Sequence, residues 1–493
     1  MVRTRIAPSP TGFFHIGTAR TALFNYLFAK KNNGSFIVRI EDTDKERSKP
    51  EFERDILEGL TWLGMQWDEG PDKKGEYGPY HQSERFALYR RYLEELNNKS
   101  LLYKCYCTKE ELEEEREMQV LSRQPPRYSG KCSARTAAEQ HALEKEGRTS
   151  TLRFRIERNR KLTIKDHIRG DLTFDTDILD DFIIAKDFDT PLYNFAVVID
   201  DHLMKISHII RGEEHISNVP KQALLAEALD FSTPEFAHLP LILNPDRTKL
   251  SKRQNKVSLL EYRTDGYLSE ALINFMVLLG WNPGGDREIF TLAELEEIFD
   301  LTRVNKSGSI FDTHKLDWFN AHYIREMDIS KLTSLCTPYF ISAGYLTEKE
   351  ASAKHEDAKI EKIVDLERER IHKISEIPLH TSYFFLTDVE YDDHLLLWKN
   401  TSPQATQEGL RIAEKVLLSL DESDFTASKI EQKLKQAIVE GKLKNGVVLW
   451  PLRVSLTGLA ASPSPFDVAA ILGKKKTLER VSHALKRISS LRP

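Results

Sequence analysis

The sequence predicts an α/β protein: a Rossmann-type parallel sheet with an inserted α+β segment, followed by an all-helical C-terminal half. Three observations support this fold class. The chain opens with a strand–helix–strand pattern. From about residue 99 to residue 190 a charged, helix-rich segment interrupts this alternation of strands and helices. Beyond Ser258 few strand-like patterns remain. Because 493 residues exceed what one hydrophobic core supports, we expect about three or four domains.

The opening segment reads as a βαβ unit. Ser35–Ile40 is a short apolar, β-branched run, Arg3–Ala7 is its expected partner strand, and the apolar run Ala19–Ala29 between them is helix-like, with Thr18 as its cap. The second strand leads into Glu41 and further acidic residues, so we expect carboxylates at the carboxyl edge of the sheet, where such folds form a crevice. Two amphipathic helices are expected next, at Asp55–Leu63 and Ser83–Leu96.

A change of texture marks the insertion. It contains a charged helical run, a proline break and a strand-like run, at Lys109–Met118, Gln124–Pro126 and Leu152–Ile156. Strands are expected to resume the sheet at Phe195–Ile199 and Ile206–Ile210, and a helix follows near Val219–Leu229. His238–Leu243 then leads to a basic loop.

The C-terminal half reads as helices. Thr291 and Glu294 form the capping-box pattern of a helix start. Further helices are expected at Ser330–Tyr339, Lys349–Glu369, Thr406–Leu420, Ala427–Glu440 and Asp467–Leu472.

Two short signatures carry the chemistry. In Pro8–Thr18, His15 stands between Gly12 and Gly17. Glycines there permit a tight turn, and backbone N–H groups at a helix start, with a ring donor beside them, bind phosphate oxygens. In Lys249-Leu250-Ser251-Lys252-Arg253, flexible cations can close over the phosphates of a nucleotide. Each signature alone is common as a plain helix start or a solvated basic loop. Together they predict a site that splits a nucleoside triphosphate by electrostatic stabilisation, without a protein nucleophile.

Composition describes an ordinary globular protein with no general attraction to nucleic acid. The formal net charge is −5, from 71 basic and 76 acidic residues, so a polynucleotide would have to meet local basic stripes. We expect no signal segment and no membrane span, since the longest apolar stretch, near Leu272–Trp281, is shorter than the about 20 residues a span needs. Four cysteines, three of them clustered, indicate a reducing compartment and a cytoplasmic protein.

The cysteine cluster has the pattern of an incomplete zinc site. Cys105, Cys107 and Cys132 offer three soft thiolate ligands, whereas tetrahedral zinc takes four. Two interpretations stay open: Tyr128 or His141 completes the site, or the three thiols are an inert vestige.

These residues resemble a known family. The chain resembles the class I aminoacyl-tRNA synthetases and, among them, the bacterial-type glutamyl-tRNA synthetases, over most of its length except about Thr337–Lys444. The segments that carry the resemblance are Arg5–Gly12, Ile37–Asp44, Val197–Met204, Ile210–His215 and Leu279–Trp281. It implies a glutamate–tRNA ligase that forms glutamyl-adenylate from ATP, releases pyrophosphate and charges tRNA-Glu. Two departures stand out: Thr18 replaces a histidine of the wider class, and Ala134 replaces a histidine that completes the zinc site of some members.

The resemblance also implies residue roles. Gly12, His15, Gly17, Lys249, Ser251 and Lys252 would bind ATP, with His15, Lys249 and Lys252 catalytic and Mg²⁺ accompanying the triphosphate. Arg5 and Tyr193 would read the side-chain carboxylate of glutamate, Arg211 its α-carboxylate, and Ser9 and Glu41 its α-amino group; a guanidinium fork suits a carboxylate. For Asp44, Asp200, Asp201 and Glu213, contacts to the tRNA end or ribose and purely structural caps remain open alternatives.

In domain terms, the resemblance implies a catalytic domain in two halves, 1–98 and 191–257, around an acceptor-end-binding insertion, 99–190. A helical stem-contact domain, 258–325, and a helical anticodon-binding domain, 326–493, would follow. The basic run Lys474–Lys476 and Arg453 are either contacts to an anticodon stem or a solvated face.

Two other functions compete, a general nucleotidyltransferase and a non-enzymatic RNA-binding paralogue. The set Arg5, Glu41, Tyr193 and Arg211 argues against the first, and the retained His15 and loop lysines argue against the second. The long helical half disfavours a glutaminyl relative and a shorter relative that modifies tRNA-Asp. We expect a monomer whose partners are tRNA-Glu, L-glutamate and ATP; whether tRNA-Gln is also charged stays open.

Overall fold

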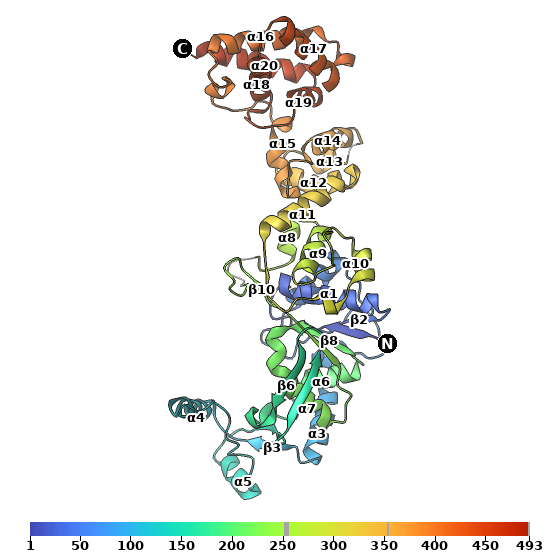
Figure 1. Cartoon of the computed structure of the whole chain (residues 1–493), viewed down its shortest axis with the longest axis vertical. Coiled ribbons are helices and arrows are strands. Elements are labelled where there is room, and N and C mark those ends of the chain that lie inside the picture. Colours follow the sequence, from blue (N-terminus) through green and yellow to red (C-terminus); the bar gives the residue numbers. More distant parts are fainter. Residues whose placement is uncertain (251–255, 353, 492–493) are drawn as a thin grey trace. The chain divides into compact units, whose positions relative to one another are not determined.

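The computed structural model describes residues 1–250, 256–352 and 354–491, and Figure 1 traces the chain. The chain forms two compact units: Met1–Arg263 with Ser269–Leu316, and Thr264–Leu268 with Asp317–Pro493. Among the helices of the described residues, none is long and apolar enough to cross a bilayer.

Parallel strand pairs form the framework of the first unit. β1 (Arg3–Ile6) pairs with β2 (Ser35–Val38), and α1 (Ile16–Lys31) connects them. β8 (His208–Gly212) pairs with β9 (Glu235–Leu239) through α7 (Val219–Ala228), in a sheet of order β6-β5-β9-β8. β10 (Ile242–Leu243) and β11 (Ser309–Ile310) form a further short parallel pair. The predicted α/β fold with parallel strands is confirmed.

The segment after α3 (Phe86–Asn98) adds antiparallel structure. β3 (Leu102–Cys105), β4 (Thr151–Phe154) and β7 (Phe182–Ala185) form a three-stranded sheet, flanked in sequence by α4 (Lys109–Leu121) and α5 (Ala137–Lys145). β5 (Lys161–Asp166) and β6 (Gly170–Asp175) form a hairpin. This hairpin joins the parallel strands through one register pair, Asp166 with Phe236 of β9.

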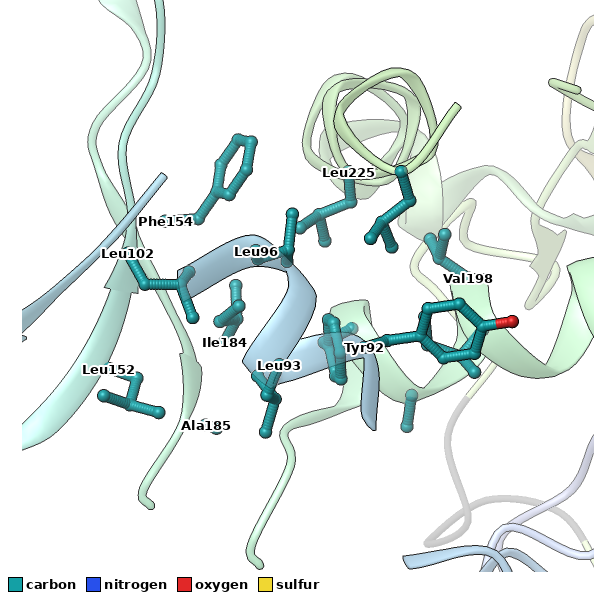
Figure 2. Packing of buried hydrophobic residues seen from close by; sticks show 14 of the residues in the cluster. Tyr92, Leu93, Leu96, Leu102, Leu152, Phe154, Ile184, Ala185, Val198 and Leu225 are labelled. Atoms are coloured by element: carbon teal, nitrogen blue, oxygen red, sulfur yellow. The ribbon is translucent and has the colours of Figure 1, made fainter. Parts of the chain in front are cut away.

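One hydrophobic core of the first unit is built around helix α3, whose buried residues recur with the helical period. Tyr89, Tyr92, Leu93 and Leu96 are buried at spacings of three and four residues, so they share one face of the helix. That face packs against strands β3, β4 and β7 and against helices α6 (Tyr193–Leu203) and α7, as Figure 2 shows. A fully buried leucine such as Leu96 contributes about 1.5–3 kcal/mol from the area it removes from water.

One predicted strand is wrong. Phe195–Ile199 belongs to a helix, α6 (Tyr193–Leu203), and not to a strand. The helix buries Phe195 through Asp201 without interruption, so it has no polar face in this stretch to reveal a helical period. A short, continuous apolar run with β-branched residues is compatible with either structure, and tertiary packing decided for the helix.

The start of α1 also differs from the prediction. The helix begins at Ile16, three residues before the predicted start, and His15 is its N-cap in place of Thr18. The His15 ring accepts hydrogen bonds from the backbone N–H groups of Gly17 and Thr18. These two groups are therefore already bound within the chain, contrary to the expectation that they stand open to phosphate.

The remaining helices follow the predicted pattern with local differences. Thr291 and Glu294 form both hydrogen bonds of a capping box at α10 (Leu292–Ile298). The predicted helix Lys349–Glu369 is divided into α13 (Glu348–Ala351) and α14 (Lys354–Glu367). Further helices are α2 (Pro50–Trp62), α8 (Leu260–Thr264), α9 (Ser269–Leu278), α11 (Thr313–Glu326), α12 (Ile329–Ser342), α15 (Ile377–Phe385), α16 (Pro403–Ser419), α17 (Ala427–Glu440), α18 (Asn445–Thr457), α19 (Pro465–Leu472) and α20 (Lys474–Ser490).

Candidate active site

A cavity of about 530 Å³ opens at the carboxyl ends of the parallel strands of the first unit. Its lining comes from the ends of β1 and β8, from Glu41 beyond β2, from the starts of α1 and α6, and from the segments that follow β9 and β10. Ser251 and Lys252 lie outside the described residues. The other residues predicted to bind ATP or glutamate all line this one cavity: Arg5, Ser9, Gly12, His15, Gly17, Glu41, Tyr193, Arg211 and Lys249.

His15 has a defined tautomer at the start of α1. Its Nδ1 lies 3.2 Å from the backbone nitrogen of Gly17 and 3.4 Å from that of Thr18, and both N–H groups donate to it. In the neutral ring the proton is therefore on Nε2, which lies 3.1 Å from the Thr18 hydroxyl. The polar hydrogen that His15 can offer a phosphate oxygen is thus the one on Nε2.

Gly17 is needed for close approach rather than for a turn. A Cβ built at this position would lie 3.2 Å from both Cε1 and Nδ1 of the His15 ring, closer than such contacts normally come. The absence of a side chain lets the ring fold over the first turn of α1. Lys249 lines the cavity and is exposed. Of the cations in the basic loop Lys249–Arg253, it is the one that lies within the described residues.

Arg211, at the end of β8, is a buried cation with neutral partners. Only 5% of its surface is exposed, and its Nε and Nη1 donate to His238 Nε2 at 3.2 Å and Gln222 Oε1 at 2.9 Å. Among the described residues, no carboxylate oxygen lies within ion-pair distance of it. Burial lowers the pKa of Arg211 below its usual value. A carboxylate ligand in the cavity would supply the missing counter-charge.

A relay behind Arg211 fixes its orientation. His238 Nδ1 lies 2.6 Å from Asp166 Oδ2, and neither side chain is exposed. Asp166 also accepts the backbone N–H groups of Ile168 and Arg169, which hold its carboxylate in place. Because Nδ1 carries the proton toward Asp166, Nε2 is free to accept from Arg211. Burial lowers the pKa of His238, which keeps the ring neutral in this role.

Arg5 has a carboxylate partner inside the protein. Its Nε and Nη2 lie 3.1 and 3.2 Å from the two carboxylate oxygens of Asp201 on α6. Arg39 Nη1 lies 2.7 Å from Asp201 and its Nη2 lies 3.1 Å from Glu41. A ligand carboxylate on Arg5 would therefore share the guanidinium with Asp201.

Asp200 anchors the other side of this buried charge network. Arg85 donates to it at 2.6 Å, Gln82 at 2.8 Å and the Tyr89 hydroxyl at 2.9 Å. With Arg39 nearby at 3.8 Å, its charge is paired and its oxygens are bonded. For Asp200 and Asp201, the structure thus favours the structural role that the sequence left open.

The other residues predicted to bind the amino acid glutamate are Glu41, Ser9 and Tyr193. Burial raises the pKa of the Glu41 carboxyl above its usual value, against the opposing effect of Arg39. The Ser9 hydroxyl donates to the Glu41 carbonyl at 2.8 Å, which ties the loop after β1 to the residue beyond β2. The Tyr193 hydroxyl lies 3.4 Å from Nδ1 of His215, whose pKa is lowered to about 4 by burial and by Arg211.

Sequence reasoning did not single out the supporting residues Arg39, Asp166, Gln222 and His238. Asp166 and His238, for example, are 72 residues apart, so no local pattern reveals their contact. A weak signal existed for Asp200 and Asp201, because two adjacent carboxylates directly after an apolar run need buried partners.

The three predicted zinc thiols do lie together. Cys107 and Cys132 sulfurs are 3.5 Å apart, and the Tyr128 hydroxyl lies 3.5 Å from Cys105 and 3.9 Å from Cys107. Burial alone would raise the pKa of Cys132, but hydrogen bonds, first that of Tyr128, lower it to about 7. The exposed His141 instead bonds the Ala137 carbonyl on its own helix. Of the two side chains considered as a fourth ligand, Tyr128 is the one beside the thiols, where its hydroxyl is hydrogen-bonded to Cys105 and Cys107.

The basic run of the second unit is partly engaged within the chain. Lys474 Nζ donates to the carbonyls of Leu418 and Leu420 at the end of α16, at 3.1 and 2.5 Å. Lys476 Nζ donates to the Phe384 carbonyl at 3.2 Å, whereas Lys475 is exposed. Lysines commonly satisfy helix C-terminal carbonyls in this way, so only Lys475 of the three is fully available to RNA.

The matches to protein families agree with this geometry. Residues 1–318 match the family described as tRNA synthetases class I (E and Q), catalytic domain, and residues 331–485 match an anticodon binding domain. The chain therefore belongs to the class I tRNA synthetases, in the family of the glutamyl and glutaminyl enzymes.

Individual relatives narrow this further, to the glutamate–tRNA ligases. That of Carboxydothermus hydrogenoformans is 46% identical over 482 residues, covering 98% of this chain and 99% of the relative. That of Bacillus licheniformis is 44% identical over 488 residues, covering 98% and 99%. A crystal structure of a glutamate tRNA ligase from Elizabethkingia meningosepticum, in complex with its amino acid, is 34% identical with a TM-score of 0.88 over 100% of both chains. The resemblance found in the sequence is confirmed.

Proposed function

We propose that this protein acts as a glutamate–tRNA ligase: it activates L-glutamate with ATP to glutamyl-adenylate, releases pyrophosphate, and transfers the glutamyl group to the 3′ end of tRNA-Glu. One observation carries the proposal. A single cavity holds a buried arginine with no carboxylate partner among the described residues, Arg211, together with a helix start that presents His15 and with the loop cation Lys249.

Activation needs no protein nucleophile. The α-carboxylate of glutamate attacks the α-phosphorus of ATP, a mixed anhydride forms, and the bond to the pyrophosphate oxygen breaks. Binding the α-carboxylate on Arg211 would align the attack, since holding two reactants in line removes most of the entropic barrier. His15 Nε2–H, Lys249 and Lys252 would stabilise the charge that develops on the phosphate oxygens.

At the amino-acid end, the α-ammonium group would be bound by the Glu41 carboxylate and by Ser9. Arg5, braced by Asp201, and the Tyr193 hydroxyl would bind the side-chain carboxylate. Two guanidinium groups for two carboxylates favour a dicarboxylic amino acid, because an amide side chain cannot accept two charge-assisted hydrogen bonds from Arg5.

Mg²⁺ would arrive with the triphosphate. Glu41, the carboxylate beyond β2 in the cavity, is already bound to Arg39, and the side-chain clusters suited to a metal in the described residues contain none of the ATP or glutamate residues. Mg²⁺ commonly binds through substrate phosphates and water, which fits this arrangement.

The domain assignment extends the proposal: a catalytic domain of 1–98 and 191–257, an acceptor-end insertion of 99–190, a stem-contact domain of 258–325 and an anticodon-binding domain of 326–493. We further propose a cytoplasmic monomer that uses ATP, L-glutamate and tRNA-Glu.

ATP–pyrophosphate exchange in the presence of tRNA-Glu tests the function. The wild type should exchange with glutamate and at least about a hundredfold less with glutamine, because an amide loses the charge-assisted hydrogen bonds to Arg5. Lys252→Ala should lower exchange by about two to three powers of ten while circular dichroism stays unchanged. Arg90→Ala, at an exposed ion pair with Asp189 outside the cavity, is the control for exchange. Exchange without preference for glutamate would refute the assigned specificity.

The thiol cluster can be tested in the same preparation. A tetrahedral zinc with Zn–S bonds of about 2.3 Å holds its sulfurs about 3.8 Å apart, close to the 3.5 Å between Cys107 and Cys132. Elemental analysis should find about one equivalent of zinc less in Cys105→Ser/Cys107→Ser than in the wild type, and the same loss in Tyr128→Phe if the phenol is the fourth ligand. A difference of less than about a tenth of an equivalent between the wild type and the double variant would assign the thiols as a vestige.

A further inference from the structure

A second group of metal-ligand side chains lies in the first unit, outside the lining of the cavity: His167, His208 and Glu235. His208 begins β8 and is the direct register partner of Glu235, which begins β9. His167 follows β5, and its backbone N–H donates to the Phe236 carbonyl at 2.8 Å. Three adjacent strands therefore each supply one side chain, at the amino ends of β8 and β9 and opposite the end that carries Arg211.

The separations suit a small tetrahedral ion. His167 Nε2 lies 2.5 Å from one oxygen of Glu235, His208 Nε2 lies 3.8 Å from the other, and all three ligand atoms lie within 4.8 Å of one another. With bonds of about 2.0–2.1 Å, ligand atoms around a tetrahedral zinc are about 3.3 Å apart, so small rotations of the side chains bring the three into range.

The hydrogen bonds of His208 prepare its Nε2 for a metal. Nδ1 lies 2.8 Å from the Ser207 hydroxyl, which is itself fixed on the backbone of Arg3 at 2.8 Å from the nitrogen and 3.2 Å from the oxygen. When the hydroxyl donates to the Arg3 carbonyl, Nδ1–H donates to the hydroxyl, and the lone pair on Nε2 faces Glu235. Such a partner on the far ring nitrogen is usual for metal-bound histidines.

We propose that His167, His208 and Glu235 form a binding site for a divalent transition-metal ion of the zinc type, with solvent in the fourth position. Two imidazoles and one carboxylate are a ligand set that zinc accepts and that Mg²⁺ does not favour. Glu235, 59% exposed at its side chain, leaves the site open to water and to an entering ion.

The ion would clamp the inserted hairpin to the parallel strands. β5 meets β9 through the single register pair of Asp166 and Phe236, so this junction has few ladder hydrogen bonds of its own. Asp166, the neighbour of His167, supports His238 behind Arg211. A metal at this position would therefore brace the strand that supports the amino-acid side of the cavity.

The test is calorimetric titration of chelator-treated full-length protein with ZnCl₂. Cys105→Ser/Cys107→Ser is used as the background, so that the thiol cluster does not compete for the ion. We expect one equivalent to bind, with affinity weakened at least about tenfold by His208→Asn and by Glu235→Gln. Ser207→Ala, which removes the hydroxyl that joins the His208 ring to the backbone of Arg3, should weaken it about tenfold or more. His314→Asn, an exposed histidine elsewhere, should change nothing.

The exposure of Glu235 protects this test from a folding artefact, because Glu235→Gln removes no buried contact. Excess MgCl₂ should not displace the bound zinc. The proposal is overturned if the background variant binds no zinc, if Mg²⁺ displaces the zinc, or if Glu235→Gln and His208→Asn both bind it as tightly as their parent.

Discussion

Replacing Arg211 tests most directly how the cavity recognises an amino acid. Arg211 is 5% exposed, its partners His238 and Gln222 are neutral, and no described carboxylate forms an ion pair with it. Arg211→Ala removes the expected two-pronged bond to the α-carboxylate. Charged hydrogen bonds are each worth about 1.5–3 kcal/mol, and a ligand charge left buried adds to the loss, so we expect about 3–5 kcal/mol.

That loss corresponds to a fall of about two to four powers of ten in kcat/KM for glutamate, measured by tRNA-dependent pyrophosphate exchange. Arg211→Lys keeps the charge and loses the fork, so its loss should be smaller, about ten- to a hundredfold. The KM for ATP should stay within about threefold, because the nucleotide binds to other residues. Arg90→Ala, at an exposed ion pair with Asp189, is the matched control.

Melting temperatures should distinguish a loss of glutamate binding from a loss of folding stability. Arg211→Lys should melt within about 2–4 °C of the wild type without ligand, the shift that 1 kcal/mol causes in a domain of this size. Glutamate should raise the melting temperature of the wild type and not that of the variant at the same concentration. An equal rise in KM for ATP and for glutamate would contradict the reasoning, and so would a glutamate kcat/KM reduced less than about threefold.

Three further predictions concern the support of the site. His238→Gln should raise the KM for glutamate about tenfold with little change for ATP, because Arg211 loses its fixed acceptor; an unchanged KM would show that the relay does not orient it. Gly17→Ala should lower exchange activity about tenfold or more while the fold is kept, since its Cβ would displace the His15 ring, and wild-type activity would refute the close-approach argument. The His215 ring, with its pKa lowered to about 4, should stay neutral down to about pH 5 in an NMR titration. Because the ring of the unfolded chain binds a proton at higher pH, His215 should lower the stability of the fold as pH falls from about 6.5 toward 4. A titration midpoint near 6.5 would be incompatible with the burial of His215 beside Arg211.

Much of the cavity was predictable from local sequence. The glycine and histidine pattern of Pro8–Thr18 and the strand that leads into Glu41 are short-range signals, and the structure places these residues in one cavity with Arg211. The capping box at Thr291 was predictable for the same reason, since its hydrogen bonds join residues three positions apart.

The predictions failed where local sequence admits two answers. The run from Phe195 to Ile199 suits a buried strand or a buried helix, and only its packing against α3 and α7 decided for the helix. Thr18 and His15 are both able to cap a helix, and the choice of His15 depended on the ring fitting over Gly17.

The sequence by itself determined the α/β class, the family and the residues able to bind phosphate and carboxylate groups, because those properties belong to short motifs and to side-chain chemistry. The tertiary structure alone decided which of these groups are paired. Arg5 is 196 residues from its partner Asp201, and Arg211 has neutral partners and no carboxylate beside it among the described residues. Charge pairing depends on distance in space and on exclusion of water, and neither is encoded at any fixed spacing along a chain.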